Sequence, residues 1–284
     1  MTAVVTPTQW QAVRAALNRA GEGFAELICA VPDPTRRVTA HWSVADTAAH
    51  IASITRLYTA IVRFEESTLP VPDLAEQLRQ ATVDTIADVN DLVLRHLTER
   101  DPGRLAEQIR TEIADILATS ADLDPSVPVP WLGDSRVPIA GVFAHLTNEL
   151  LIHGYDIATA TGADWSIPAA DSALFWEVFL VKMTQHSYGR LLDTDEPPSS
   201  RRIAVEFRSD HTTPVTLVLR DGLVSVEEPG DDPDVRLLFD PVVLNLMLFG
   251  RVSRLRAVLT RKVVIRGRRP WLLLPFLRVM RLPS

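Results

Sequence analysis

Two histidines and one glutamate are spaced so that their side chains could hold a metal ion. Glu149 and His153 are four residues apart, so on a helix they lie on one face, one turn from each other. His50 occurs much earlier and could supply a third ligand from a neighbouring helix. Two imidazoles and one carboxylate leave coordination positions open, as in proteins that use a metal ion for catalysis. These residues predict a catalytic metal centre.

Two carboxylates are spaced so that they could orient the histidines. Asp156 follows His153 by three residues, and Asp46 precedes His50 by four. Either carboxylate could accept the second ring N–H of its neighbour and fix the imidazole. Asp46 also has a simpler interpretation, because a negative charge is stabilising near a helix N-terminus.

Three further residues have alternative interpretations. His145 precedes Glu149 by four residues and could be a fourth ligand, a proton carrier or a surface histidine. Trp131 lies in a proline-rich connection and could line the mouth of the site or pack the loop down. Cys29 is the only cysteine, which excludes an intramolecular disulfide and a cysteine-based zinc site. Its apolar neighbours predict a small buried hydrophobic side chain.

The composition is typical of a globular protein that can build a full core. Hydrophobic residues make up 46% of the chain and charged residues 23%. The net charge of -7 gives no reason to expect nucleic-acid binding. We find no signal-peptide pattern at the N-terminus, and the apolar stretch 271–277 is too short to span a bilayer. We therefore expect a cytoplasmic monomer or homodimer that binds no membrane.

The length of the chain and the distribution of its charges indicate two domains. A chain of 284 residues is long for a single domain. The segment 241–284 contains no Asp or Glu but ten basic residues: Arg251, Arg254, Arg256, Arg261, Lys262, Arg266, Arg268, Arg269, Arg278 and Arg281. This segment could form a basic surface that balances an acidic first half, or it could attract an anionic substrate or an acidic partner.

The first two thirds of the chain have the period of helices. The expected helices begin at Pro7, after Ser43, at about Pro72, at Pro102, at about Ile139 and at Pro168. Ser43 and Asp46 match a capping box with Asp in the acidic position. The third helix is expected to reach Glu99. The segment 124–138 holds four prolines and is expected to be an irregular connection. The helix that carries Glu149 is expected to stop at Gly162.

The last third has the period of strands. The segment 193–200 is polar and proline-rich, as a linker is. After it, apolar residues alternate over 203–207 and 215–219, and Asp221-Gly222 is a strong hairpin signal. Further strands and short helices follow. The sequence therefore predicts a mixed α and α/β chain, with a helical bundle over residues 1–194 and a small α+β domain over residues 201–284.

Two segments carry the motif of a known family. Trp42 to His50 has the pattern W-S-V-x-D-x-x-x-H, and Asn148 to Asp156 has the pattern N-E-x-x-x-H-G-x-D. Both resemble the DinB-like metalloenzymes of the mycothiol-dependent maleylpyruvate isomerase type. The C-terminal stretch resembles the sterol-carrier-protein-like domain often fused to them, over residues 239–241, 248–251, 255–259 and 267–271.

This resemblance implies a fold, a metal and a cosubstrate. The fold would be a DinB-like bundle of the four-helix type, followed by a sterol-carrier-like domain. The metal would be zinc or another divalent ion held by His50, Glu149 and His153, and the cosubstrate would be mycothiol, a low-molecular-weight thiol. We predict an enzyme that activates this thiol for attack on a small electrophile. If the adduct later expels the thiol after bond rotation the result is cis–trans isomerisation, and if another group leaves it is S-transfer.

Three residues are assigned further roles on this basis. Arg251 and Asp156 are the predicted catalytic side chains, and Arg251 and Trp131 are predicted to bind the cosubstrate. Arg251 lies in the family-like Phe249-Gly250-Arg251 turn, where its planar fork could hold a carboxylate of the thiol or the substrate. For the second domain we favour a docking or lid role over lipid carriage.

Two other functions fit the same residues. Two histidines and one carboxylate are also the ligand set of non-haem Fe(II) oxygenases. The chain could instead be a carrier of a lipid or small molecule, with a metal that is structural or absent. Metal content measured together with oxygen uptake distinguishes an oxygenase from the thiol-activating enzyme. Ligand binding that survives removal of the metal would indicate a carrier.

Overall fold

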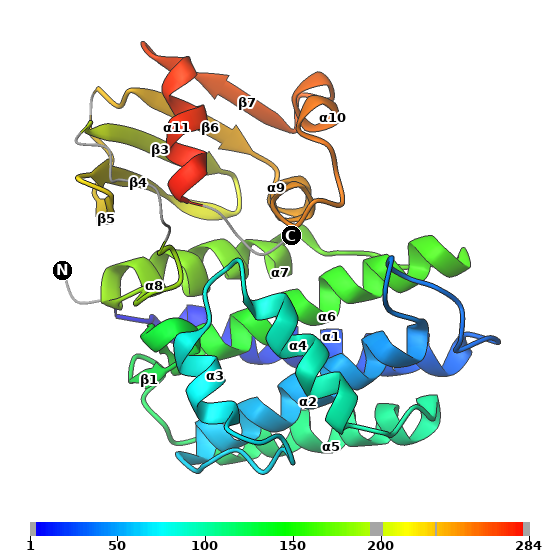
Figure 1. The fold of residues 1–284 in the computed structure, drawn as a ribbon. Coiled ribbons are helices and arrows are strands. Elements are labelled where there is room, and N and C mark those ends of the chain that lie inside the picture. The colour runs from blue at the N-terminus through cyan, green and yellow to red at the C-terminus, as the bar shows by residue number, and fades with distance from the viewer. Residues whose placement is uncertain (1–3, 194–200, 231, 281–284) are drawn as a thin grey trace.

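The computed structural model describes residues 4–193, 201–230 and 232–280, and these form two lobes (Figure 1). The lower lobe in Figure 1 consists of helices, and the upper lobe is a small sheet with helices beside it. The predicted fold class, a helical part followed by a small α+β part, is confirmed. None of the helices in the described ranges is long and apolar enough to cross a membrane.

Four long helices build the helical lobe. They are α1 (Pro7–Ala30), α2 (Val44–Arg63), α5 (Pro102–Thr119) and α6 (Ile139–Thr161). Helix α1 contacts α5 and α6, and α2 contacts the same two helices, so the four enclose one core. The large side chains Phe24, Ile109 and Phe143 are fully buried in it. Burial of this apolar surface does not depend on a metal ion.

The ends of these helices follow the local signals in the sequence. Thr6 caps α1, and Ser43 caps α2 in a capping box completed by Asp46. Asp101 caps α5 through the backbone N–H of Arg104. Gly162 ends α6 in the left-handed conformation that glycine adopts without strain.

The predicted third helix and the predicted irregular connection both differ in the structure. Two helices, α3 (Leu74–Gln80) and α4 (Ile86–His96), replace the single helix expected up to Glu99. In the break, Ala81 is extended and the side chain of Thr85 accepts a hydrogen bond from the backbone N–H of Thr82. The connection 124–138 contains a two-stranded ribbon of β1 (Pro128–Pro130) and β2 (Arg136–Pro138).

A helical segment links the bundle to the second lobe. It comprises α7 (Ala169–Leu174), the π-helical turn η2 (Phe175–Leu180) and α8 (Val181–His186). Trp176 of η2 packs on Phe207 and Phe239 of the sheet, with ring centroids 4.3 and 5.6 Å apart. The larger of two clusters of buried apolar residues runs through both lobes, and the smaller one lies around α3 and α4. The two predicted domains therefore share a core across their contact, and most of the predicted linker, residues 194–200, lies outside the described residues.

The second lobe is a five-stranded sheet in the order β5-β4-β3-β6-β7. Its strands are β3 (Ile203–Ser209), β4 (Thr212–Arg220), β5 (Leu223–Glu227), β6 (Val235–Phe239) and β7 (Val263–Arg266). Only the β3–β6 pair among them is parallel. Asp221 and Gly222 both have positive φ and form the predicted hairpin turn. The short helices α9 (Pro241–Leu248), α10 (Arg254–Leu259) and α11 (Leu273–Val279) complete the lobe.

The central strand β3 departs from the predicted alternation of apolar and polar positions. Ala204 and Glu206 are buried together with the apolar residues between them, because both faces of β3 are covered. The carboxylate of Glu206 is fully buried and pairs with Arg236 at 3.2 Å and with Arg208. A buried charge of this kind requires such partners.

Trp165 packs between two glycines, which gives a test of the bundle's packing. A Cβ on Gly154 would lie 2.8 Å from Cη2 of Trp165 and closer still to two other ring atoms, whereas a Cβ on Gly23 would lie 3.7 Å from the ring. Gly154→Ala is expected to destabilise the protein by about 1–3 kcal/mol through overpacking. Gly23→Ala is expected to stabilise it by roughly 0.5–1 kcal/mol, because alanine favours the helix.

Thermal unfolding of the two glycine variants measures this difference. The melting temperature should fall for Gly154→Ala and rise for Gly23→Ala. Equal shifts of the same sign in both variants would contradict the placement of Trp165 against Gly154.

Candidate metal centre

Three donor atoms converge between helices α2 and α6. Nε2 of His50 lies 3.7 Å from Oε2 of Glu149, and Nε2 of His153 lies 3.4 Å from the same oxygen. One donor atom from each of the three residues lies within 4.8 Å of the others. A tetrahedral zinc ion with bonds of about 2.0–2.1 Å separates neighbouring ligand atoms by about 3.4 Å. The three predicted ligands therefore fit a divalent ion in both chemistry and spacing.

The donor atoms are shielded from water by the side chains around them. His50 is 3% exposed and His153 8%. The ring of Trp42 lies over His50 at a centroid distance of 4.7 Å, and its indole nitrogen donates to Asp91 of α4 at 3.0 Å. Low exposure strengthens every electrostatic interaction at the site, because few water molecules screen it.

The three proposed ligands have perturbed acid–base properties. Burial raises the pKa of Glu149, but the contacts with His153 and His50 outweigh it and hold the pKa well below its usual range. Burial also lowers the pKa of His50, so this imidazole is neutral and able to ligate. Burial lowers the pKa of His153 as well, but the carboxylates of Asp156 and Glu149 outweigh this effect and raise the pKa to about 9.

The raised pKa of His153 predicts that protons compete with the metal. In the metal-free protein this imidazole is protonated below about pH 9, and it must lose the proton in order to ligate. We expect the apparent zinc affinity to rise about tenfold per pH unit between roughly pH 7 and 9, and then to level off. Titration calorimetry at pH 7 in two buffers of different ionisation enthalpy should detect release of about one proton per zinc. An affinity that does not change over this range would contradict the assignment.

Asp156 connects the three proposed ligands to the second lobe. Its Oδ2 lies 3.3 Å from Nδ1 of His153, within ion-pair distance but without the geometry of a hydrogen bond. Arg251 donates to the same carboxylate from Nε at 3.0 Å and from Nη2 at 2.7 Å, a two-point contact. Burial raises the pKa of Asp156, but His153 and Arg251 lower it overall. Asp156 is thus a charged carboxylate that lies between His153 and Arg251.

A second contact ties the same helix to the second lobe. Nδ2 of Asn245 in α9 donates to Oδ1 of Asn148 at 3.1 Å and to the backbone carbonyl of Ser172 at 3.0 Å. Asn148 precedes Glu149, whereas Asp156 follows His153, so the second lobe contacts α6 on both sides of the ligand pair. This arrangement holds the second lobe against the part of α6 that carries Glu149 and His153.

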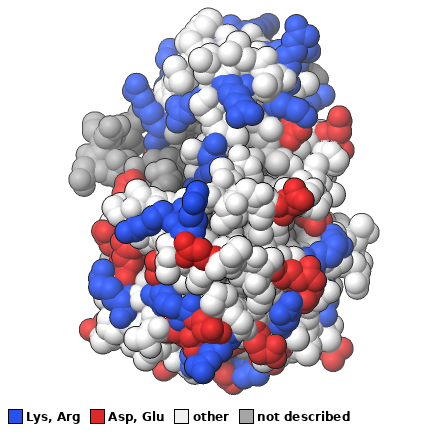
Figure 2. All heavy atoms as spheres, turned by 90° about the vertical axis from the view of Figure 1, so that its right-hand side faces the viewer, with Lys and Arg blue, Asp and Glu red and all other residues white. Residues whose placement is uncertain are grey.

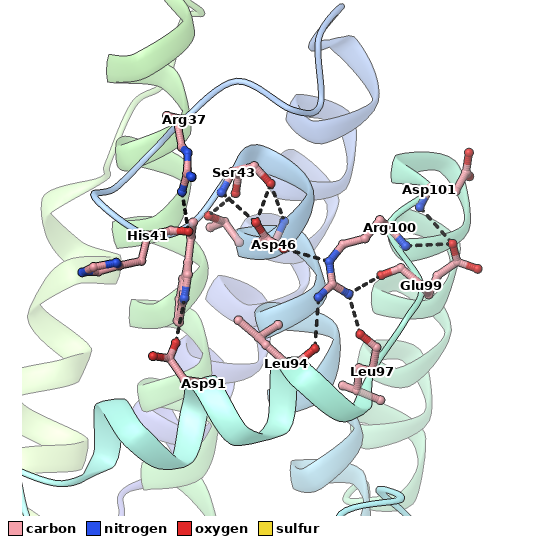
Figure 3. A network of polar contacts seen from close by, with 12 residues as sticks. Arg37, His41, Ser43, Asp46, Asp91, Leu94, Leu97, Glu99, Arg100 and Asp101 are labelled. Carbon is pink, nitrogen blue, oxygen red and sulfur yellow. Dashed lines mark hydrogen bonds and ion pairs between the residues drawn. The ribbon is translucent and has the colours of Figure 1, made fainter.

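The proposed role of Asp46 in orienting His50 is wrong. Figure 3 shows the carboxylate directed to Ser43 and Arg100. Its Oδ2 accepts from the backbone N–H of Ser43 at 3.0 Å, and its Oδ1 accepts from Nε of Arg100 at 2.8 Å. The reason is the capping box, which turns the side chain back over the first turn of α2. Asp46 therefore fixes the start of the helix that carries His50.

His145 and Trp131 both lie beside the three proposed ligands. Nε2 of His145 is 3.5 Å from Oε1 of Glu149, and Nδ1 is 2.9 Å from the hydroxyl of Tyr58. The indole nitrogen of Trp131 donates to that hydroxyl at 2.8 Å. His145 is therefore not a surface histidine, and it lies outside the cluster of three donor groups.

Sequence reasoning missed Tyr58 and misplaced Cys29. The spacing of Tyr58 along α2 marks it as an inward-facing residue, and only its hydroxyl signals a polar role. Cys29 is exposed near the end of α1, not buried as predicted, because the inward-facing positions of this turn are Leu27 and Ile28. Of its apolar neighbours in the sequence, Leu27 and Ile28 face the core, whereas Ala30 is exposed as Cys29 is.

Lys and Arg side chains gather on the upper lobe in Figure 2, whereas most Asp and Glu lie on the helical lobe. Several of the predicted basic residues are already paired. Lys262 contacts Asp240 at 2.8 Å, and Arg269 contacts Asp234 at 3.2 Å. Both pairs lie within the second lobe, whereas Arg251 pairs with Asp156 of the helical lobe.

A helical bundle with a buried cluster of two histidines and one glutamate defines a class of metal-binding protein. The model of the mycothiol maleylpyruvate isomerase N-terminal domain family matches residues 10–158, just over half of the chain. The chain belongs to this family, which identifies it as an enzyme of the mycothiol-dependent isomerase or thiol-transferase type.

The chain is similar to solved structures, two of them of mycothiol-dependent maleylpyruvate isomerase, and no curated protein matches it. One is the mycothiol-dependent maleylpyruvate isomerase, with 15% identity, a TM-score of 0.47, and coverage of 89% of this chain and 91% of that one. The other is a histidine-to-alanine mutant of the mycothiol-dependent maleylpyruvate isomerase, with 14% identity, a TM-score of 0.49 and the same coverage.

Proposed function

We propose that the protein is a divalent-metal enzyme, with zinc as the ion, that uses mycothiol as cosubstrate. It would act on a small electrophile by thiol-assisted cis–trans isomerisation or by S-transfer. The observation that carries this proposal is the buried cluster of His50, Glu149 and His153 in a chain of this family. A divalent ion held there would lower the pKa of a coordinated thiol, so that the thiol loses its proton near neutral pH.

The charges around the cluster favour a cation. Glu149 and Asp156 are negative, and Arg251 and protonated His153 are positive, so the four groups of the metal-free site sum to zero. Loss of the proton from His153 leaves a net charge of −1 in a buried place, which attracts a cation. Because three protein groups ligate, a position stays free for a substrate atom.

The second lobe would position and close the site. Arg251 uses Nε and Nη2 to hold Asp156, and Nη1 donates to the backbone carbonyl of Phe249 at 2.5 Å. We propose that Arg251 first fixes Asp156 and so the ring of His153, and that its remaining N–H groups serve a carboxylate of the thiol or the substrate. Trp131, which is half-buried beside His145, is proposed to line the approach to the cluster.

The experiment is incubation of the zinc-loaded protein with mycothiol and a panel of electrophiles, maleylpyruvate among them. Mass spectrometry and ultraviolet absorbance would follow thiol adducts and isomers. Turnover that needs both zinc and mycothiol supports the proposal. Oxygen uptake by the Fe(II)-loaded protein, with no thiol-dependent product, would instead indicate an oxygenase.

A non-catalytic lipid carrier is not favoured by the cavity in the second lobe. The cavity is apolar and lies among Phe207, Leu237, Leu244 and Phe276, with a volume of about 170 Å³. Ligand pockets usually measure about 300–1,000 Å³, so this one is small for a sterol or an acyl chain. We propose that the lobe, which resembles the sterol-carrier domain in sequence, serves to dock on α6.

A further inference from the structure

Two hydrogen bonds link Trp131 through Tyr58 to His145, whose other ring nitrogen faces Glu149. Trp131 Nε1 lies 2.8 Å from the Tyr58 hydroxyl, which lies 2.9 Å from Nδ1 of His145. On the other side of the ring, Nε2 of His145 lies 3.5 Å from Oε1 of Glu149. Tyr58 is 3% exposed, so its hydroxyl has little access to water.

The donor at one end fixes the direction of every bond in the chain. An indole nitrogen can only donate, so the Tyr58 oxygen accepts from Trp131. The single hydroxyl proton of Tyr58 is then directed to Nδ1 of His145, since Tyr58 has no other polar partner in the described ranges. If Nδ1 carried a proton instead, the buried hydroxyl proton of Tyr58 would have no acceptor, which costs about 1–3 kcal/mol. The neutral ring therefore carries its proton on Nε2.

The ring of His145 is also held in place by aromatic neighbours. Its centroid lies 4.7 Å from Phe179 and 4.8 Å from Trp131, with Phe175 at 6.1 Å. A flip that exchanged the two nitrogens would break the bond to Tyr58 within this packing. The Nε2–H group thus stays directed at Glu149.

The two oxygens of Glu149 have different neighbours. Oε2 lies between His50 and His153, at 3.7 and 3.4 Å from their Nε2 atoms. Oε1 faces His145 at 3.5 Å, which is longer than a hydrogen bond and acts as an attraction between the N–H dipole and the carboxylate. Oε2 therefore faces the other two proposed ligands, and Oε1 faces His145.

We propose, on the basis of the proposed metal function, that His145 is a positioning residue that holds Glu149 as a one-oxygen ligand. Trp131 and Tyr58 act through it by setting its tautomer. The same arrangement keeps His145 out of the ligand set, because Nδ1 accepts from Tyr58 and Nε2 bears the proton. A coordination position consequently stays open for the thiol sulfur.

The first test uses the metal-free protein and does not depend on activity. Nitrogen-15 correlation spectra of the histidine rings report which ring nitrogen carries the proton. We expect His145 to be the Nε2–H tautomer. The Nδ1–H tautomer in the wild-type protein would overturn the proposal.

The second test uses cobalt(II) as the probe ion. His145→Leu removes the N–H group and is expected to lower cobalt affinity about 10- to 100-fold, as loss of a ligand's outer partner does. His145→Gln retains an N–H donor and should recover most of the affinity, with a visible spectrum like that of the wild type. His186→Leu, a substitution at a half-buried histidine of α8, is the matched control and should not change the affinity.

The outcomes separate this proposal from the metal function itself. A wild-type protein that binds no cobalt would overturn both. A protein that binds cobalt but shows equal affinity in His145→Leu would overturn the positioning role alone. A changed visible spectrum in His145→Gln would show that His145 is a ligand, which also contradicts it.

Discussion

Replacement of His153 by alanine is expected to remove the metal and the activity while the fold survives. His153 supplies one of three proposed ligand atoms, with its Nε2 3.4 Å from Oε2 of Glu149. Loss of a ligand should lower zinc affinity by more than the roughly 100-fold that loss of an outer partner can cost. His50→Ala should have the same effect. The helices should persist, because the bundle core is apolar and does not require the ion, unlike that of a zinc finger.

Metal analysis and circular dichroism of the purified variants provide the measurement. His211→Ala serves as the control, because this histidine is exposed in the turn between β3 and β4. The control should retain about one divalent ion per chain. One ion per chain in both His50→Ala and His153→Ala would rule out the assigned site.

Loss of Arg251 is expected to weaken both the metal site and the protein. The side chain of Asp156 is 9% exposed, and Arg251→Ala leaves it without its two-point partner. Removing one partner of a buried pair costs about 3–5 kcal/mol, and we expect the lower end because His153 still faces Asp156. A loss of about 3 kcal/mol corresponds to a melting temperature roughly 6–12 °C lower. Zinc affinity should fall about 10- to 100-fold, since the ring of His153 is no longer fixed.

A double-mutant cycle separates the interaction energy of Arg251 and Asp156 from the effect of each residue alone. Asp156→Asn removes the buried charge, so Arg251→Ala should cost less stability in that background than in the wild type. Arg251→Lys should recover only part of the loss, because an ammonium group cannot reproduce the fork. Arg268→Ala is the control, since its pair with Asp232 is exposed and is worth at most about 1 kcal/mol. Unchanged zinc affinity in Arg251→Ala would leave only a structural role for the residue.

The elements of the fold that could be predicted from the sequence are those governed by local signals. The capping residue Ser43, the terminating Gly162 and the turn at Asp221-Gly222 each act within a few residues, and the structure has them as expected. The break between α3 and α4 was missed because no proline or glycine marks it in the sequence, and the hydrogen bond between Thr82 and Thr85 is seen only in the folded chain. The burial of residues 203–207 of β3 on both faces depends on which elements cover the sheet, and a pattern within the strand cannot show this.

The candidate site also has residues that the sequence predicts and contacts that only the folded chain shows. Spacing on one helix placed Glu149 and His153 together, and the motif added His50 from another helix. The pairing of Arg251 with Asp156 joins two lobes, so no pattern within either segment could reveal it. The role of Tyr58 was hidden for a related reason. Its partners Trp131 and His145 come from other parts of the chain, and only the folded molecule brings the three together.

Anomalous X-ray diffraction at the zinc absorption edge tests the central claim most directly. Crystals grown with one equivalent of zinc should show one strong peak, about 2.0–2.2 Å from Nε2 of His50, Oε2 of Glu149 and Nε2 of His153. No protein atom of His145 should lie at bonding distance from that peak. A peak bound by other residues, or no peak at this cluster in zinc-containing crystals, would contradict the account.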